Sequence, residues 1–317
     1  MIRWLSLCWL MLSVQSAAAE PPPLTINQIQ FVGSHNSYKQ AMSPLIFKAL
    51  HLLDAEVAEG LEYWHLPISE QLDLGLRKLE IDVFYDADSQ AFPVGHAQVI
   101  DMNTHCNTLN ACLRQVAGWS KQNPRHAPIW ISFNLKDQII TGLPDPDPFT
   151  PAALKLFDQQ LQVEVGEQLI KPADVQGLRW PTLQQARGKV LLILDEGGSK
   201  RDWYYQGWQS RPMFTNAPEG HPAAAVMIIN DPIKDFERIQ RLVQAGYLVR
   251  TRADADTRQA RANDTRQRDR AFASGAQAIS TDYYLPATHF GNDYQVTLYG
   301  GIRCNPVLTP PGCTVSE

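Results

Sequence analysis

Several features of common protein classes are missing from this chain of 317 residues. It has no stripe of basic residues interleaved with aromatics, and its formal net charge is −5, so nucleic acid is a poor candidate partner. No internal repeat and no Gly/Ser-rich linker divides the chain into modules. Its 44% of hydrophobic residues can fill a sizeable core, so disorder of the whole chain is not expected.

The chain also lacks a hydrophobic run long enough to span a membrane. Residues 4–14 are apolar, but they are fewer than the ~20 residues that a helix needs to cross hydrocarbon. Arg3 precedes this run and an alanine triplet ending at Ala19 follows it, a pattern typical of a secretory signal peptide. We therefore predict a signal peptide over residues 1–19, a mature domain over residues 20–317 without a transmembrane segment, and a secreted or periplasmic location.

Cysteine is scarce, with five in the chain, and Cys8 belongs to the predicted signal peptide. The even number that remains, in an oxidising compartment, predicts disulfide bonds. Three pairings are open, and closure of the shortest loops favours Cys106–Cys112 with Cys304–Cys313. A zinc site is the alternative, but these spacings lack the close ligand pairs of a structural zinc site.

Short β-rich runs alternate with helical patterns along the rest of the chain. The predicted strands are residues 28–33, 76–84, 91–95, 129–135, 189–194, 224–229, 247–251 and 278–281. The predicted helices are residues 69–74, 109–122, 151–163, 235–245 and 258–274. Such alternation favours a single-domain α/β fold, a (β/α)8 TIM barrel, over a doubly wound open sheet. The segment GSHNSY after the first strand also lacks the glycine-rich fingerprint of a Rossmann fold.

Polar side chains lie at or near the carboxyl end of almost every predicted strand. In chain order they are His35, Asn36, Glu80, Asp82, His96, Asn134, Lys136, Asp195, Arg250, Arg252 and Asp282. The carboxyl ends of the strands of an α/β barrel meet at one mouth, which is where such barrels carry their chemistry. The sequence therefore predicts one polar ring at that mouth.

Glu80 and Asp82 are two residues apart on a predicted strand, so their side chains share one face. An acidic pair with a purely structural role is the simplest interpretation. Inside a barrel mouth, however, two carboxylates repel each other and lose solvation unless a cation compensates them. Calcium or magnesium suits such oxygens, and Asn36 adds a neutral amide oxygen of the same kind. We predict a metal site here.

His35 and His96 face the same predicted mouth. A single histidine is more often structural, but two of them beside a predicted metal site favour catalysis. Such a pair can divide the duties of general base and general acid in phosphodiester cleavage, because an imidazole titrates near working pH. The histidines predicted to be structural or on the surface are His51, His65, His105, His126, His221 and His289.

Arg250 and Arg252 share one face of a predicted strand, and guanidinium groups suit a phosphate or an anionic headgroup. An ion pair between these arginines and a nearby aspartate such as Asp282 is an equally open interpretation. Two interpretations stay open for the aromatic segment RDWYYQGWQ, residues 201–209: contact with a lipid interface and ordinary loop packing. The predicted substrate contacts are Lys136, Arg250, Arg252 and Asp282.

A set of segments in fixed order resembles a known family. The segments are GSHNSY, HLPISEQLDLGLRKLEIDVFYD, VGHA, IWISFNLKD, TRADADT and GAQAISTDYY. They resemble the bacterial calcium-dependent phosphatidylinositol-specific phospholipases C, within the superfamily of phospholipase C-like phosphodiesterases. The resemblance covers residues 28–286, and its specific part is the order of the segments with the pattern G-x-R-x-x-E-x-D.

The resemblance implies that the barrel is a distorted (β/α)8 barrel. The catalytic pair and the calcium ligands that it implies are His35, His96, Asn36, Glu80 and Asp82. Relatives generally have another acid on strand four, and by strand alternation Asn134 stands at that position, so one charge is missing here. Either the amide oxygen of Asn134 coordinates, or calcium binds more weakly, since ligand charge tunes affinity.

The resemblance further implies an enzyme that converts phosphatidylinositol to diacylglycerol and a cyclic inositol phosphate, with transient contact with a membrane surface. His35 would interact with the phosphoryl group, and the other partner or a nearby base would take the proton of the inositol 2-hydroxyl. His96 would stabilise the transition state and protonate the diacylglycerol oxygen, although the two roles are exchangeable. Calcium would lower the pKa of the attacking inositol 2-hydroxyl and offset charge on the phosphoryl oxygens.

Two other functions stay open at this point. A glycerophosphodiester phosphodiesterase of the same barrel superfamily would have an H-R-G start after the first strand, where this chain has His35, Asn36 and Ser37. A secreted binding protein with impaired catalysis is supported only by Asn134, because both histidines and the other ligands are retained.

Overall fold

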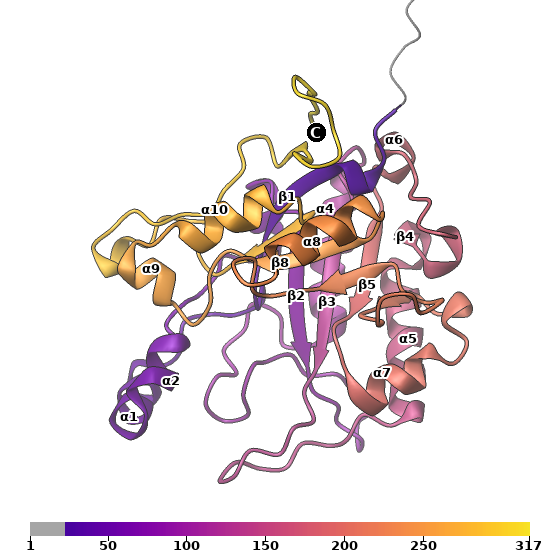
Figure 1. Cartoon of the computed structure of the whole chain (residues 1–317). Helices are drawn as coiled ribbons and strands as arrows, with labels where there is room; N and C mark the ends of the chain where they lie inside the picture. Colours follow the sequence, from indigo (N-terminus) through magenta and orange to yellow (C-terminus); the bar gives the residue numbers. More distant parts are fainter. Residues whose placement is uncertain (1–22) are drawn as a thin grey trace, which may run out of the picture.

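A curved sheet covered by helices forms the centre of the computed structural model, which describes residues 23–317 (Figure 1). The predicted signal peptide over residues 1–19 lies outside the described residues. The strands are β1 (Ile29–Ser34), β2 (Lys78–Val83), β3 (Ile129–Leu135), β4 (Leu169–Ile170), β5 (Val190–Leu194), β6 (Met213–Thr215), β7 (Val226–Ile228), β8 (Leu248–Arg252), β9 (Ala278–Thr281) and β10 (Ile302–Cys304). The α-helices are α1 (Pro44–Leu53), α2 (Ala55–Gly60), α3 (Ile68–Asp73), α4 (Leu109–Gln122), α5 (Pro151–Val165), α6 (Leu183–Ala186), α7 (Gly198–Tyr205), α8 (Phe236–Gln244), α9 (Arg258–Ala262) and α10 (Arg266–Ala273).

Parallel pairing of neighbouring strands extends the curved sheet around most of a ring. The main path is β4-β5-β3-β2-β1-β9-β8-β7, with β6 paired to β5 and β10 antiparallel to β1. A single parallel bridge, Thr215↔Ala224, links the end of β6 to the residues before β7. The parallel strands β1, β2, β3, β5, β6, β7, β8 and β9 therefore form a distorted, incompletely closed TIM-like barrel. This confirms the predicted fold class.

The strand prediction is wrong in one segment and incomplete in others. Residues 91–95 form only isolated bridges such as Val83↔Val94, and Pro93 has no N–H group to donate to a ladder. The sequence does not predict β4, β6 and β10, which have 2 or 3 residues each, because such short runs show no alternation.

The predicted helix over residues 258–274 is also wrong, because it is divided into α9 and α10. Asn263, with φ at 50°, is in the left-handed region and ends α9.

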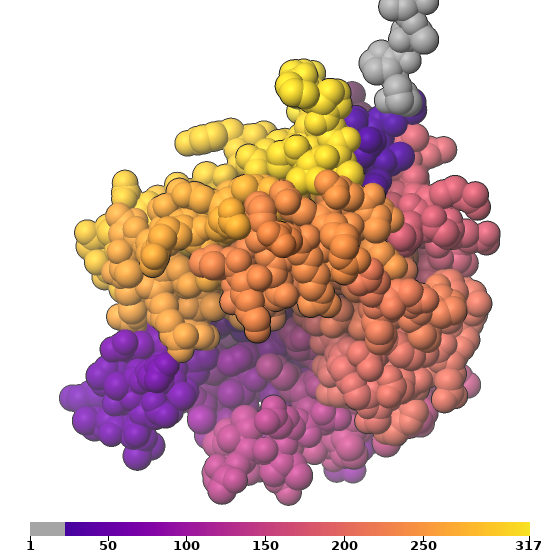
Figure 2. Space-filling view, viewed as in Figure 1, coloured from indigo at the N-terminus to yellow at the C-terminus, as the bar shows by residue number. Residues whose placement is uncertain are grey.

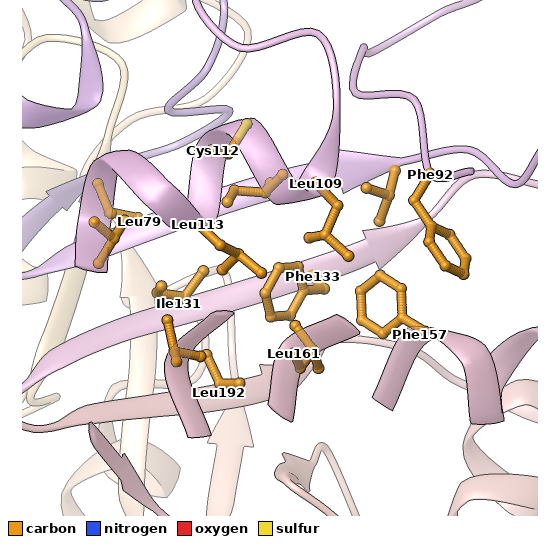
Figure 3. Close-up of a cluster of buried hydrophobic side chains, with 14 of the residues drawn as sticks. Leu79, Phe92, Leu109, Cys112, Leu113, Ile131, Phe133, Phe157, Leu161 and Leu192 are labelled. Atoms are coloured by element: carbon orange, nitrogen blue, oxygen red, sulfur yellow. The ribbon is translucent and has the colours of Figure 1, made fainter. Parts of the chain in front are cut away.

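Alternation along β2 divides its side chains between two layers. Leu79 faces outward into a buried cluster between the sheet and helices α4 and α5, together with Leu113, Phe133 and Phe157 (Figure 3). Burying each such side chain contributes roughly 1.5–3 kcal/mol. The alternate residues, including Glu80, point the other way, into the barrel. The outer core thus fixes which side chains of β2 reach the interior.

Two disulfides are formed, Cys106–Cys112 and Cys304–Cys313, which confirms the predicted pairing. The first holds the loop before α4 against that helix, and the second ties β10 to the chain beyond it. With all of these thiols paired, the zinc alternative is wrong.

Close approach between β1 and β2 depends on Gly33. Gly33 pairs with Lys78, and a Cβ added to Gly33 would lie 2.0 Å from the carbonyl oxygen of Lys78 and 2.3 Å from its Cβ. Backbone atoms cannot yield to such a contact, so any side chain here forces the two strands apart. Gly33 therefore allows the side chain of Lys78 to enter the barrel beside β1.

We predict that Gly33→Ala lowers the free energy of unfolding by about 3 kcal/mol, because overpacking displaces both strands. Chemical denaturation followed by circular dichroism measures the change. Gly118→Ala on α4 is the matched control, since no atom lies within 4 Å of its added Cβ, and stability should be unchanged or slightly higher. Equal stability of Gly33→Ala and wild type would contradict the proposed constraint.

Candidate active site

A polar cavity of about 380 Å³ opens at the carboxyl ends of the strands. It is lined by eight of the predicted site residues, His35, Glu80, Asp82, His96, Asn134, Lys136, Arg250 and Arg252. Asp282 is buried and contacts His35 of this lining, and Asn36, the next residue in the chain after His35, is also buried. The structure thus brings most of the side chains predicted for the polar ring to one cavity, including Asp195.

The turn after β1 is held by both neighbouring strands. The His35 backbone N–H donates to the Thr281 carbonyl oxygen at 2.9 Å, at the end of β9. The Ser37 N–H donates to the Glu80 carbonyl oxygen at 2.9 Å, and the Glu80 N–H donates back to Ser37 Oγ at 2.8 Å. Between them Asn36 has φ at 47°, in the left-handed region that asparagine tolerates better than most residues.

His35 is held between two carboxylates. Its Nδ1 lies 2.9 Å from Asp282 Oδ1, and its Nε2 lies 3.6 Å from Glu80 Oε1. Arg252 Nη2 lies 3.1 Å from the same Nδ1. Burial, and then the charge of Arg252, holds the pKa of His35 well below its usual range, although Glu80 opposes this shift. His35 is therefore a neutral imidazole near pH 7.

His96 reaches the cavity from the loop between β2 and α4 rather than from a strand end, which corrects its predicted placement. Its Nδ1 lies 3.3 Å from Asp101 Oδ2, and its side chain is 25% exposed. Asp101 also accepts a hydrogen bond from Lys39 Nζ at 2.5 Å. A buried carboxylate thus faces Nδ1 of His96, as Asp282 does for His35.

Glu80 is the most strongly compensated carboxylate in the cavity. Its Oε2 accepts hydrogen bonds from Lys78 Nζ at 2.5 Å and from Arg250 Nη2 at 2.7 Å. Burial alone would raise the pKa of Glu80, but Lys78 and Arg250 hold it well below its usual range. Glu80 is therefore ionised despite being only 2% exposed.

Asp82 and Asn134 are side by side because β2 and β3 pair them in register. The amide nitrogen of Asn134 donates to Glu80 Oε1 and to Asp82 Oδ1, both at 3.0 Å. Lys136 follows β3, and its Nζ lies 2.9 Å from Asp82 Oδ2. Protein donors thus face each oxygen of the two carboxylates.

The oxygen atoms gathered here nevertheless fit a hard cation. Asn36 Oδ1 is buried and accepts no hydrogen bond, while the amide nitrogen of Asn36 donates to Tyr63 OH at 2.7 Å. This orphaned oxygen is of the kind that calcium coordinates, as are the oxygens of Glu80, Asp82 and Asn134. Over residues 23–317 no group of three His, Cys, Asp or Glu side chains has metal-binding geometry.

Sequence reasoning missed several residues of the site. Lys78 could have been found, because it precedes Glu80 and Asp82 at the same alternation on β2. Tyr63, whose hydroxyl lies 3.4 Å from His35 Nδ1, and Asp101 come from irregular segments, where no periodic pattern indicates a position.

Two buried aspartates support the His35 side of the cavity. The Asp282 backbone N–H donates to Asp254 Oδ1 at 2.8 Å, and Tyr294 OH donates to Asp254 Oδ2 at 3.2 Å. Burial, and then the charge of Asp282, raises the pKa of Asp254 to about 7. Burial also raises the pKa of Asp282 to about 6, although Arg252 opposes this shift.

Two histidines beside carboxylates, with cationic side chains at the mouth of an α/β barrel, define a site for phosphoryl chemistry. The sequence profile of "Phosphoinositide phospholipase C, Ca2+-dependent" matches residues 24–93 and 87–306. The chain therefore belongs to this family of phosphodiesterases. A comparison with curated proteins finds no significant match.

Solved structures with the same fold include three bacterial phospholipases C. The calcium-dependent phosphoinositol-specific enzyme from a Gram-negative Pseudomonas sp. has 18% identity and a TM-score of 0.56, over 89% of this chain and 95% of that chain. The Ca2+-dependent phosphatidylinositol-specific enzyme from Streptomyces antibioticus has 18% identity and a TM-score of 0.55, over 82% and 95%. The phosphatidylinositol-specific enzyme from Listeria monocytogenes has 16% identity and a TM-score of 0.52, over 87% and 92%.

The raised pKa of Asp254 predicts a pH-dependent stability. Between its ordinary value of 3.8 and about 7, an unfolded chain releases the proton while the folded protein keeps it, so stability falls as pH rises through this window. Asp254→Asn removes the effect. Relative to this variant, the free energy of unfolding of wild type should fall by a few kcal/mol as pH rises through this window, at roughly 1.4 kcal/mol per pKa unit.

Urea denaturation at pH 4, 5.5 and 7.5 measures this difference. Asp145→Asn, in the exposed loop after β3, is the control and should follow wild type at each pH. A constant difference between wild type and Asp254→Asn across the series would show that Asp254 does not titrate in this range.

Proposed function

We propose that the protein is a calcium-dependent phosphodiesterase that converts phosphatidylinositol to diacylglycerol and a cyclic inositol phosphate. One observation carries the proposal: His35 and His96 line a single cavity, and the Nδ1 of each faces a buried carboxylate. We assign proton transfer at the substrate to Nε2 of each ring, which at His35 lies on the side of Glu80, 3.6 Å from its Oε1.

His35 is suited to act on the attacking hydroxyl. With Nδ1–H donating to Asp282, the neutral ring has an acceptor at Nε2. Nε2 then takes the proton of the inositol 2-hydroxyl as that oxygen attacks phosphorus. Asp282 fixes the orientation of the ring and stabilises the imidazolium that forms.

His96 is suited to the leaving group. Asp101, held in place by Lys39, lies 3.3 Å from Nδ1 of the His96 ring and orients it. His96 Nε2 then gives a proton to the diacylglycerol oxygen as the bond to phosphorus breaks, so one proton is taken up and one is released.

Of the predicted substrate contacts, Arg252 is the one that we assign to the phosphate, because it lines the cavity beside His35. Arg250 and Asp282 are positioning residues, since their charged groups contact Glu80 and His35.

The oxygens of Asn36, Glu80, Asp82 and Asn134 would hold Ca2+, as the orphaned Oδ1 of Asn36 supports. When bound, Ca2+ supplies charge that lowers the pKa of the hydroxyl and offsets the charge on the phosphoryl oxygens. The disulfides, which persist in oxidising compartments, favour a secreted or periplasmic location.

We predict that His35→Ala and His96→Ala each lower kcat at least about 100-fold, the usual contribution of a general acid or base. ³¹P NMR of phosphatidylinositol with calcium measures both rate and product, and wild type should form cyclic inositol phosphate first. His221→Gln, outside the cavity, is the control and should retain activity. Hydrolysis of glycerophosphocholine without any cyclic product would instead identify a glycerophosphodiesterase.

Contact with a membrane surface is best supported at α1. This helix has no buried residue, and Leu45, Leu52 and Leu53 are 79%, 80% and 86% exposed. In the space-filling view α1 and α2 form a lobe that projects at lower left (Figure 2). Over residues 23–317 no helix has both the length and the apolar character to cross a membrane. An apolar helix at the protein surface suits the plane of the lipid interface instead.

An apolar groove lies beside this helix, and one residue of its lining approaches His35. The groove, of about 240 Å³, is lined by residues that include Phe47 of α1, Trp64 and Tyr63, whose hydroxyl approaches His35. By contrast, Tyr204 in the aromatic segment 201–209 is buried and donates to Asp158 at 2.7 Å. We therefore assign lipid contact to α1.

Replacing two apolar side chains of α1 tests this assignment. Leu52→Ser with Leu53→Ser should lower activity on phosphatidylinositol vesicles at least about tenfold, since less apolar area enters the lipid. Activity on a short-chain, monomeric phosphatidylinositol should be unchanged. The control Val163→Ser, an equally exposed position on α5, should behave as wild type on both substrates. Equal losses on vesicles and monomers would contradict a role in lipid contact.

A further inference from the structure

Lys136 lies where a cation would neutralise Asp82. Its Nζ is 2.9 Å from Asp82 Oδ2, with the lysine side chain 29% exposed and the aspartate 1% exposed. The Lys136 backbone N–H donates to the Val83 carbonyl oxygen at 2.8 Å, which holds the start of the side chain beside the end of β2. A partly exposed ammonium group thus covers a buried carboxylate from the side of the cavity.

The other cations of the cluster are placed differently. Lys78 and Arg250 both bind Oε2 of Glu80, and their side chains are 0% and 3% exposed. Lys78 also donates to the Ser34 carbonyl oxygen and to Ser280 Oγ, both at 2.9 Å. Lys78 is enclosed in the barrel interior, and Arg250, although it lines the cavity, is almost fully buried and is held by both Glu80 and Asn230.

Lys136 is the cation of this cluster that is able to leave. A lysine ammonium is a compact charge on a flexible stem, and one end of this stem is already in contact with solvent. Its departure exposes Asp82 Oδ2 to the cavity while Lys78 and Arg250 stay on Glu80. Arrival of a divalent cation at Asp82 requires that departure, because two positive charges on one oxygen repel each other.

We propose that Lys136 is a built-in counter-cation that competes with Ca2+ for Asp82 and so sets the calcium concentration that the site requires. The inference rests on the proposed calcium site. Asn134 strengthens the effect: an acid at its position would add a charge that favours the divalent ion, whereas the amide leaves the balance to Lys136.

Isothermal titration of CaCl2 into the chelator-treated protein tests the proposal. Lys136→Met keeps the length of the side chain and removes its charge, so it should bind Ca2+ about tenfold more tightly than wild type. Lys136→Arg keeps the charge and should stay within about twofold of wild type.

Lys200→Met is the matched control, because Lys200 lines the same cavity but pairs with Glu196 at 2.9 Å and Asp137 at 2.8 Å. Its affinity for Ca2+ should stay within about twofold of wild type. A gain in Lys200→Met equal to that in Lys136→Met would overturn the proposal, because the general charge of the cavity would then explain both. Equal affinities of Lys136→Met and wild type, or no calcium binding by any variant, would also overturn it.

Product analysis by ³¹P NMR on the same samples separates this inference from the proposed function. Cyclic inositol phosphate formed by a protein whose calcium affinity ignores Lys136 would reject the inference alone. The predicted ranking of affinities without any cyclic product would reject the proposed reaction and retain the role of Lys136.

Discussion

Charge compensation of the buried carboxylate of Glu80 is the constraint on which the rest of the site depends. A carboxylate that is 2% exposed costs several kcal/mol in lost solvation unless cations and hydrogen bonds replace the water. Lys78 supplies one cation from the same strand, which requires the close contact of β1 and β2 at Gly33. Arg250 supplies another from β8, across the barrel. The close contact of β1 with β2 and the charge compensation of Glu80 therefore depend on each other.

The same compensation shapes the chemistry of the mouth. Burial, and then the charge of Arg252, holds the pKa of His35 well below its usual range, so that the ring is ready to accept a proton while Asp282 orients it. Farther out, Asp82 meets the solvent-facing Lys136, so the balance of charge remains adjustable at the edge where a phosphodiester enters. Fixed charge lies deep in the barrel and exchangeable charge lies at its mouth. This gradient suits a site that must bind an anionic substrate and a cation together.

Much of this site could be predicted from the sequence because strand geometry is regular. Alternation on β2 and the shared end of parallel strands are enough to place Asp82 and Asn134 at one mouth, where β2 and β3 pair them. The predicted strand over residues 91–95 is wrong because an apolar run in a buried loop has the same pattern as a strand. The position of Asp101 could not be predicted from the sequence, since Asp101 pairs with Lys39 across 62 residues and neither lies on a helix or strand. Long-range pairing from loops has no periodicity to detect.

Anomalous X-ray diffraction from crystals grown with calcium tests the central claim most directly. The account predicts a calcium peak in contact with oxygens of Glu80, Asp82 and Asn36, with the ammonium of Lys136 moved off Asp82 and Lys78 still bound to Glu80. A peak elsewhere in the barrel, or a peak at this place with Lys136 unmoved, would contradict it.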